Sequence, residues 1–279
     1  MSNVDYDFLR YQAAVNDWDA RLGPTLSRPV VPVLCGPVGA ATHVGTGVLL
    51  KAGDQVIFVT AAHVPRSWNP NIIGIAGKLT QIPTLRLTPI PPGLKPEDDL
   101  LDVGAGLLPA GDVQRLSPAD AVPMERLDLS EQAYRLGNQF YLIGFPVSRQ
   151  PAAFVGHEWN VRPFKLIAEE LPPEVYGAAQ IDSRENLILD FDKQDVYRDG
   201  RLQTAPDLYG VSGGAIYRLD GGSASRRKPL LAAIATTWHK RGKPPRIVAT
   251  RISTIVRVLR AYFPELSLPS LPILHEGSR

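Results

Sequence analysis

Residues 210–214 read Gly-Val-Ser-Gly-Gly, and the apolar run 215–217 follows them directly. A serine hydroxyl becomes a useful nucleophile where the backbone approaches closely and directs amide groups at a developing oxyanion, and glycine permits that approach. Serine and glycine are also common turn residues, so the stretch taken alone favours a plain turn. Its meaning depends on what precedes it in the chain.

Two earlier stretches supply the partners that a nucleophilic serine needs. Residues 59–63 read Val-Thr-Ala-Ala-His, and residues 99–103 read Asp-Leu-Leu-Asp-Val. Acyl transfer requires a base for the hydroxyl proton and an acidic group that orients this base. His63, Asp102 and Ser212 are the candidates for base, orienting acid and nucleophile. Asp98 and Asp99 are close by, and Asp102 is preferred because an apolar run begins immediately after it.

Short β-type runs separated by Gly, Pro and Asp fill most of the chain from Pro29 onward, with no clear helix among the early ones. They predict an all-β fold of two six-stranded antiparallel barrels, with the active site between them and a helix at each end of the chain. The expected strands of the first barrel are 30–34, 45–51, 55–60, 72–75, 84–87 and 103–108; those of the second are 140–143, 164–168, 187–191, 215–218, 230–236 and 247–250.

The expected division of the chain has four parts. Residues 1–25 form an amphipathic helix that ends at Gly23 and Pro24, residues 26–118 form the barrel with the histidine and the aspartate, and residues 119–253 form the barrel with the serine. Residues 254–279 contain a second helix and a proline-rich tail. The segment 109–127 is rich in Pro, Ala, Asp and Gly and predicts the linker between the barrels.

Composition narrows the function classes. The 279 residues are 44% hydrophobic and 21% charged with a formal net charge of +2, which argues against nucleic acid or a membrane as the partner. Cys35 is the one cysteine, so the chain makes no disulfide with itself. Residues 1–21 lack a basic segment followed by an apolar run, so they are not expected to be a signal peptide. We therefore expect a soluble, cytoplasmic protein. The histidines lack metal-ligand spacing and no phosphate-binding loop is present, so neither a metal nor a cofactor is expected.

The motifs at 60–63, 102–104 and 210–214, in this order, resemble those of the chymotrypsin-like (trypsin-fold) serine peptidases, in particular the bacterial-type members without disulfides. The segments 141–146 and 249–252 extend the resemblance across roughly residues 29–263. It implies a serine endopeptidase that hydrolyses protein or peptide substrates through an acyl-enzyme. His63 would be the base, Asp102 would orient it, Ser212 would attack, and the backbone amides of Gly210 and Ser212 would form the oxyanion hole.

The resemblance also implies a substrate site and shows one departure. It places the base of the substrate pocket shortly before Ser212, near Asp207, for which two roles are open: selecting a basic side chain or bonding within a surface turn. Thr236, Thr237 and Trp238 match the substrate-pairing edge, and Trp238 either walls the pocket or completes the core. Val211 stands where secreted relatives carry the acid used in zymogen activation. Control, if present, would then come from a regulatory protein partner, from loop ordering or from the N-terminal helix.

Two other readings remain open from the sequence. Residues 210–214 also satisfy the nucleophile elbow of an α/β-hydrolase esterase, which needs a helix after the serine and the order Ser, Asp, His, with Asp220 and His239 as partners. The chain could instead be a protease-like module that binds partners without catalysis. Labelling by a fluorophosphonate probe separates these readings.

Overall fold

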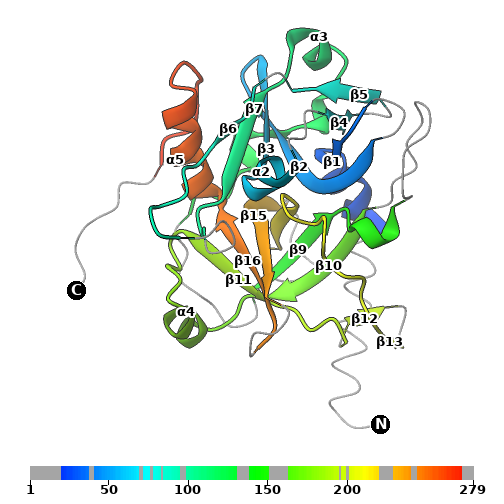
Figure 1. Ribbon diagram of the computed structural model, residues 1–279, viewed down its shortest axis with the longest axis vertical. Coiled ribbons are helices and arrows are strands. Elements are labelled where there is room, and N and C mark those ends of the chain that lie inside the picture. Colours follow the sequence, from blue (N-terminus) through cyan, green and yellow to red (C-terminus); the bar gives the residue numbers. More distant parts are fainter. Residues whose placement is uncertain are drawn as a thin grey trace.

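Two curled antiparallel sheets, one from each half of the chain, make up most of the computed structural model, one above the other in Figure 1. The predicted all-β class is confirmed. The structure describes residues 20–37, 41–68, 72–75, 78–82, 84–94, 99–130, 138–150, 163–194, 196–198, 201–219, 229–239 and 244–271.

The first sheet has the strand order β5-β4-β1-β2-β3-β7-β6, and β8 joins β2 in parallel. All six strands expected in this half are present, and β5 is an addition that its mixed polar sequence did not reveal. β8 and two short 3-10 turns lie within the expected linker, so that part of it extends the first sheet. The strands are β1 (Val30–Cys35), β2 (Thr42–Ala52), β3 (Gln55–Ala61), β4 (Ile72–Ile75), β5 (Lys78–Gln81), β6 (Arg86–Leu87), β7 (Val103–Leu107) and β8 (Val122–Pro123).

The second sheet has the order β10-β9-β14-β15-β16-β11, and all six of its strands match the expected runs. An isolated antiparallel bridge between Glu170 and Leu189 links the two ends of this order, so the sheet closes on itself. A small two-stranded ribbon lies beside it. The strands are β9 (Gln139–Gly144), β10 (Phe164–Glu169), β11 (Asn186–Asp190), β14 (Ala215–Leu219), β15 (Leu230–His239) and β16 (Arg246–Arg251), with β12 (Val196–Arg198) and β13 (Arg201–Gln203) in the ribbon.

In the described part of the chain, helices are few and short. Besides α3 (Ala110–Val113), α2 (His63–Trp68) begins at the candidate base. The helix α4 (Pro173–Ala179) was not predicted, and the prolines at its start favour a first helical turn. α5 (Ile252–Tyr262) is the expected C-terminal helix. Residues 20–27 are also helical, and the earlier part of the expected N-terminal helix lies outside the described residues. The predicted end at Gly23 and Pro24 is therefore wrong, because Leu26 is buried in the core and keeps the last turn in place.

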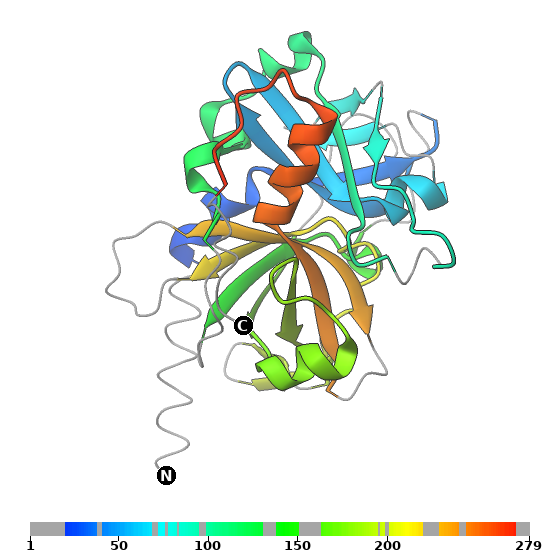
Figure 2. The same ribbon diagram turned by 90° about the vertical axis from the view of Figure 1, so that its left-hand side faces the viewer.

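One hydrophobic cluster joins the two sheets and α5. It combines Val48 and Ile57 of the first sheet with Ile143 of the second and Leu259 of α5, and all four are 0% exposed. Figure 2 shows α5 leaving the lower sheet and running up along the side of the upper one. Burial of this much apolar surface fixes the two sheets against each other. The loops at their junction thus have defined neighbours.

Candidate active site

His63 and Asp102 are brought together by strand pairing. In the β3–β7 ladder Ala61 lies opposite Val103. His63 follows Ala61 by two residues and Asp102 directly precedes Val103, so the two meet at the same edge of the sheet. The imidazole Nδ1 of His63 is 2.6 Å from Oδ2 of Asp102, and the backbone amide of His63 donates to Oδ1 at 2.8 Å. The carboxylate is 2% exposed. Both its oxygens therefore hold the histidine, one through the ring and one through the main chain.

Asp102 has a φ of 28°, which is in the left-handed region that residues other than glycine rarely adopt. Its neighbours hold it there. The second barrel supplies the restraints, because Asn186 Nδ2 donates to the Leu100 carbonyl at 2.8 Å and Thr250 Oγ1 donates to the Leu101 carbonyl at 3.1 Å. Such strain persists only where the surroundings over-determine it, and it is common at functional sites.

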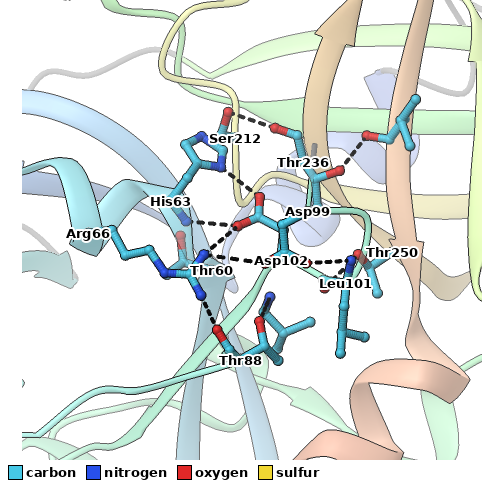
Figure 3. A network of polar contacts seen from close by, with 12 residues as sticks. Thr60, His63, Arg66, Thr88, Asp99, Leu101, Asp102, Ser212, Thr236 and Thr250 are labelled. Atoms are coloured by element: carbon cyan, nitrogen blue, oxygen red, sulfur yellow. Dashed lines mark hydrogen bonds and ion pairs between the residues drawn. The ribbon is translucent and has the colours of Figure 1, made fainter. Parts of the chain in front are cut away.

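Ser212 lies beside the imidazole of His63, on the side away from Asp102 (Figure 3). Its hydroxyl donates to the Thr236 carbonyl at 3.0 Å. Thr236 is the residue skipped in the β15–β16 register between Ala235 and Thr237, and such a bulge redirects the groups of one residue. If the Ser212 side chain rotated toward the ring, its hydroxyl would donate to the imidazole nitrogen of His63 instead of to the Thr236 carbonyl.

The loop before Ser212 is a tight turn in which two amides have no hydrogen-bond acceptor among the described residues. The Val211 amide donates to the Leu208 carbonyl at 2.9 Å, with Gly210 between them at a φ of 91°. The amides of Gly213 and Gly214 also donate to backbone carbonyls. By contrast, those of Gly210 and Ser212 have no acceptor among the described residues. Paired amides of this kind suit an oxyanion.

Thr46 of β2 fastens this loop to both barrels. Its hydroxyl donates to the Gly210 carbonyl at 2.7 Å and accepts from the Phe145 amide at 3.0 Å. Its own amide donates to the Ser212 carbonyl at 2.8 Å, and its carbonyl accepts from the Thr60 hydroxyl at 2.6 Å. The side chain is 0% exposed. One threonine of the first barrel therefore positions the serine loop of the second.

The same junction leaves no room at Gly213. A Cβ there would lie 1.8 Å from the Thr46 carbonyl oxygen, and the φ of 91° is itself unfavourable for any other residue. This glycine lets the loop approach the first barrel closely enough for the hydrogen bonds of Thr46 to form.

His43 lies behind Gly210. Its ring is 5% exposed and meets Phe145 edge to face, with 6.3 Å between the ring centroids. A Cβ on Gly210 would lie 2.9 Å from its Cε1. Burial lowers the pKa of His43 to about 4, a shift that the backbone of Gly45 only partly offsets. The imidazole is therefore neutral packing behind the loop at neutral pH.

The residues expected to bind substrate are spread around the same region. Asp207 pairs with Lys193, with Nζ and Oδ1 2.7 Å apart, so its negative charge has a partner. Trp238 meets Phe191 edge to face at a centroid distance of 5.7 Å and packs against the apolar cluster that contains Ala205. Thr237 pairs with Val248 on β15. The Asp207 pairing is of the kind expected of the surface-turn role, and the apolar surroundings of Trp238 fit either of its two expected roles.

Val211 is 3% exposed and packs on Gly144. An acidic side chain buried at this position would need a positive partner, whereas valine needs only apolar contact. The apolar anchor thus explains locally how the loop is held without a carboxylate.

Sequence reasoning did not identify Thr46 as part of the site, and it considered Asp99 only as an alternative to Asp102. A polar residue between two glycines in the apolar run 45–51 was the available signal for Thr46. In the described part of the chain no group of three or more His, Cys, Asp or Glu side chains is arranged to hold a metal ion. Within that same part, no helix has the length and apolar character needed to cross a membrane.

Neither the family models nor the curated proteins that were compared with the sequence gave a match. Solved structures did match. One is neuropsin, a serine protease expressed in the limbic system of mouse brain, at 15% sequence identity and a TM-score of 0.55. The likeness covers 86% of this chain and 96% of that protein. Two curled β-sheets with His63, Asp102 and Ser212 at their junction, together with this likeness, show that the chain has the chymotrypsin-like fold of the trypsin-type serine proteases.

Proposed function

We propose that this chain is a serine endopeptidase that cleaves peptide bonds through an acyl-enzyme. The observation that carries the proposal is the 2.6 Å contact between His63 Nδ1 and Asp102 Oδ2, with Ser212 at the other side of the ring (Figure 3). When Nδ1 carries the proton and donates a hydrogen bond to Asp102, the neutral ring presents an unprotonated Nε2 on the serine side. That nitrogen is the base.

The reaction would begin when Ser212 turns from the Thr236 carbonyl toward His63. As Oγ forms a bond to the substrate carbonyl carbon, its proton passes to Nε2, and Asp102 stabilises the imidazolium that results. The carbonyl oxygen becomes an oxyanion and accepts hydrogen bonds from the amides of Gly210 and Ser212. Each such donor typically contributes a factor of about 10² to 10³ in rate.

Collapse of the tetrahedral intermediate breaks the C–N bond, and the imidazolium gives its proton to the leaving amine. Water then repeats the sequence on the acyl ester, with His63 again as the base, and releases the carboxylate product. No cofactor is required by this chemistry. The substrate class is a protein or a peptide, and the one cysteine of the chain suits a reducing cytoplasm.

The α/β-hydrolase reading is wrong, because strand β14 follows Ser212 where the nucleophile elbow needs a helix. The reading as a binding module without catalysis makes a different prediction from the proposal, namely that Ser212 is not reactive.

A fluorophosphonate probe tests this difference, since it transfers its phosphonyl group to an activated serine Oγ with loss of fluoride. We expect the wild type to be labelled, Ser212→Ala not to be labelled, and His63→Ala to be labelled at least about 10³-fold more slowly. His239→Ala is the matched histidine control and should react at the wild-type rate. Equal labelling of all four proteins would overturn the proposal. Cleavage of a peptide library by the wild type but not by Ser212→Ala would then establish peptidase activity.

A further inference from the structure

Three charged side chains form a cluster directly behind His63. Arg66 lies one helical turn after His63 in α2, so its guanidinium reaches back to the same side. Its Nη1 is 3.3 Å from Oδ2 of Asp99 and 3.9 Å from Oδ1 of Asp102. Figure 3 shows the guanidinium beside both carboxylates. Arg66 therefore bridges the orienting acid to a second acid that the triad does not use.

The cluster is almost closed to solvent. The side chains of Asp99 and Asp102 are each 2% exposed and that of Arg66 is 18% exposed. Asp99 Oδ1 also accepts from the Leu101 amide at 3.1 Å, and Arg66 Nη2 donates to the Thr88 carbonyl. Two buried carboxylates this close are costly unless a positive charge lies between them. Arg66 supplies that charge, and the net charge of the cluster is one negative.

Among the described residues, two further titratable groups near the cluster are Arg86 of β6 and Tyr262 of α5. Burial raises the pKa of Tyr262, the charges of Arg66 and Arg86 oppose this rise, and the charge of Asp99 adds a smaller upward effect. Arg86 stacks over the ring of Phe263, with its guanidinium carbon 4.8 Å from the ring centroid. Tyr262 is neutral at the pH of interest. The charge that acts on His63 is thus set mainly by Arg66, Asp99 and Asp102.

We propose that Arg66 is a positioning residue that holds Asp99 and Asp102 together and limits the charge acting on His63 to one net negative. The inference rests on the proposed function, in which His63 must be neutral to accept the proton of Ser212. A second uncompensated carboxylate would favour the imidazolium before substrate arrives. The guanidinium prevents this, and it leaves Asp102 ionised to stabilise the imidazolium formed during the reaction.

The test is the pH dependence of the fluorophosphonate labelling rate of the full chain between about pH 4.5 and 9. Arg66→Leu raises the negative charge of the cluster, so the acid midpoint of the rate should move up by about one pH unit. Asp99→Asn removes one negative charge and should move the midpoint down by about as much. In the double variant the net charge is again one negative, and the midpoint should return to within a few tenths of the wild-type value.

Two controls separate charge from structure. Arg66→Lys keeps the charge and should leave the midpoint in place even if the plateau rate falls. Arg184→Leu removes an arginine that pairs with Asp182 at the surface, with a side chain 70% exposed, and solvent should screen its loss entirely. A purely structural role predicts lower stability and a lower plateau with no movement of the midpoint, or movement in the same direction for Arg66→Leu and Asp99→Asn.

Either of those outcomes overturns the inference. If Arg66→Leu does not fold, Asp99→Asn decides alone, because an unmoved midpoint then contradicts the proposed charge balance. Failure of the proposed function is recognised separately, since a wild type that is not labelled, or is labelled no faster than Ser212→Ala, gives no profile that depends on His63.

Discussion

Replacement of Thr46 tests whether the first barrel holds the loop that carries Ser212 in place. Valine has nearly the shape of threonine, so Thr46→Val keeps the packing of this fully buried side chain and removes only its hydroxyl. Two hydrogen bonds are lost, at 2.7 Å to the Gly210 carbonyl and at 3.0 Å from the Phe145 amide. Serine in the same place keeps the hydroxyl and loses one methyl group. The two variants therefore separate the hydrogen bonds from the packing.

The expected magnitudes differ clearly. A buried polar group left without a partner costs about 1 to 3 kcal/mol. The Gly210 carbonyl and the Phe145 amide both lose their partner in Thr46→Val, so the free energy of unfolding should fall by about 2 to 6 kcal/mol. Loss of one buried methyl in Thr46→Ser should cost about 1 kcal/mol. Since small displacements of reacting groups slow catalysis strongly, labelling of Ser212 in Thr46→Val should fall by about 10²-fold.

Urea unfolding followed by tryptophan fluorescence measures the first quantity, and fluorophosphonate labelling in buffer without urea measures the second. Thr254→Val is a control at a buried threonine of α5 whose hydroxyl accepts from Arg257 at 2.8 Å, and it should not change the labelling rate. If Thr46→Val and Thr46→Ser lose equal stability and react equally fast, the hydroxyl does not hold the loop and the reasoning is refuted.

Three further outcomes follow from the site. In Gly213→Ala the new Cβ would lie 1.8 Å from the Thr46 carbonyl oxygen, so labelling should be abolished and the free energy of unfolding in urea should fall by at least about 4 kcal/mol. Gly53 has a φ of 59° and no described atom within 4 Å of such a Cβ, so Gly53→Ala should lower it by only about 1 kcal/mol. Similar losses in the two variants would contradict the steric argument. Burial lowers the pKa of His43 from 6.5 to about 4, so between these pH values His43 is protonated in the unfolded chain and neutral in the folded chain. The stability it provides is complete above pH 6.5 and is lost as the pH falls to about 4, and the wild type should lose about 3 kcal/mol more than His43→Leu over this range; parallel curves of unfolding free energy against pH would contradict this. Asp102→Asn and Asp102→Ala should both slow labelling by about 10⁴-fold, but only alanine should add roughly 1 kcal/mol of instability, because asparagine tolerates the φ of 28°. Equal stability of these two variants would argue that the backbone there is not strained.

The strands of this protein were predictable because their signal is local. Apolar runs bounded by glycine, proline and aspartate predicted all six strands of the second sheet and six in the first sheet, including β2 and β3. The strand β5 escaped because Lys-Leu-Thr-Gln at 78–81 has little apolar character of its own and pairs with β4 through the backbone. The helical segment at 20–27 continued past its expected end because burial of Leu26, a tertiary contact, outweighed the local signals of Gly23 and Pro24.

The sequence indicated which residues the candidate site contains, but it revealed little of the hydrogen bonds and ion pairs that surround them. The candidates for nucleophile, base and orienting acid each lie in a motif whose residue types suit that role, so His63, Asp102 and Ser212 could be named from the sequence, and the structure places them next to one another. Thr46 and Arg66 could not, because their roles come from contacts with residues far away in sequence, such as Gly210 and Asp99. The ion pair between Lys193 and Asp207 could likewise not be seen from residues close in sequence. It matters because Lys193 partly neutralises the charge with which Asp207 could attract a basic side chain of a substrate.

The restraints on Asp102 have a consequence for the time at which the site appears during synthesis. His63 and Asp102 leave the ribosome early, but the carbonyls of Leu100 and Leu101 are held by Asn186 and by Thr250 of β16, which come much later in the chain. A nascent chain that ends before β16 lacks Thr250 and, if it ends before residue 212, also lacks the nucleophile. We therefore expect the geometry of the site to form only when the second barrel is complete, so that under the proposed function Ser212 becomes reactive only in the finished fold.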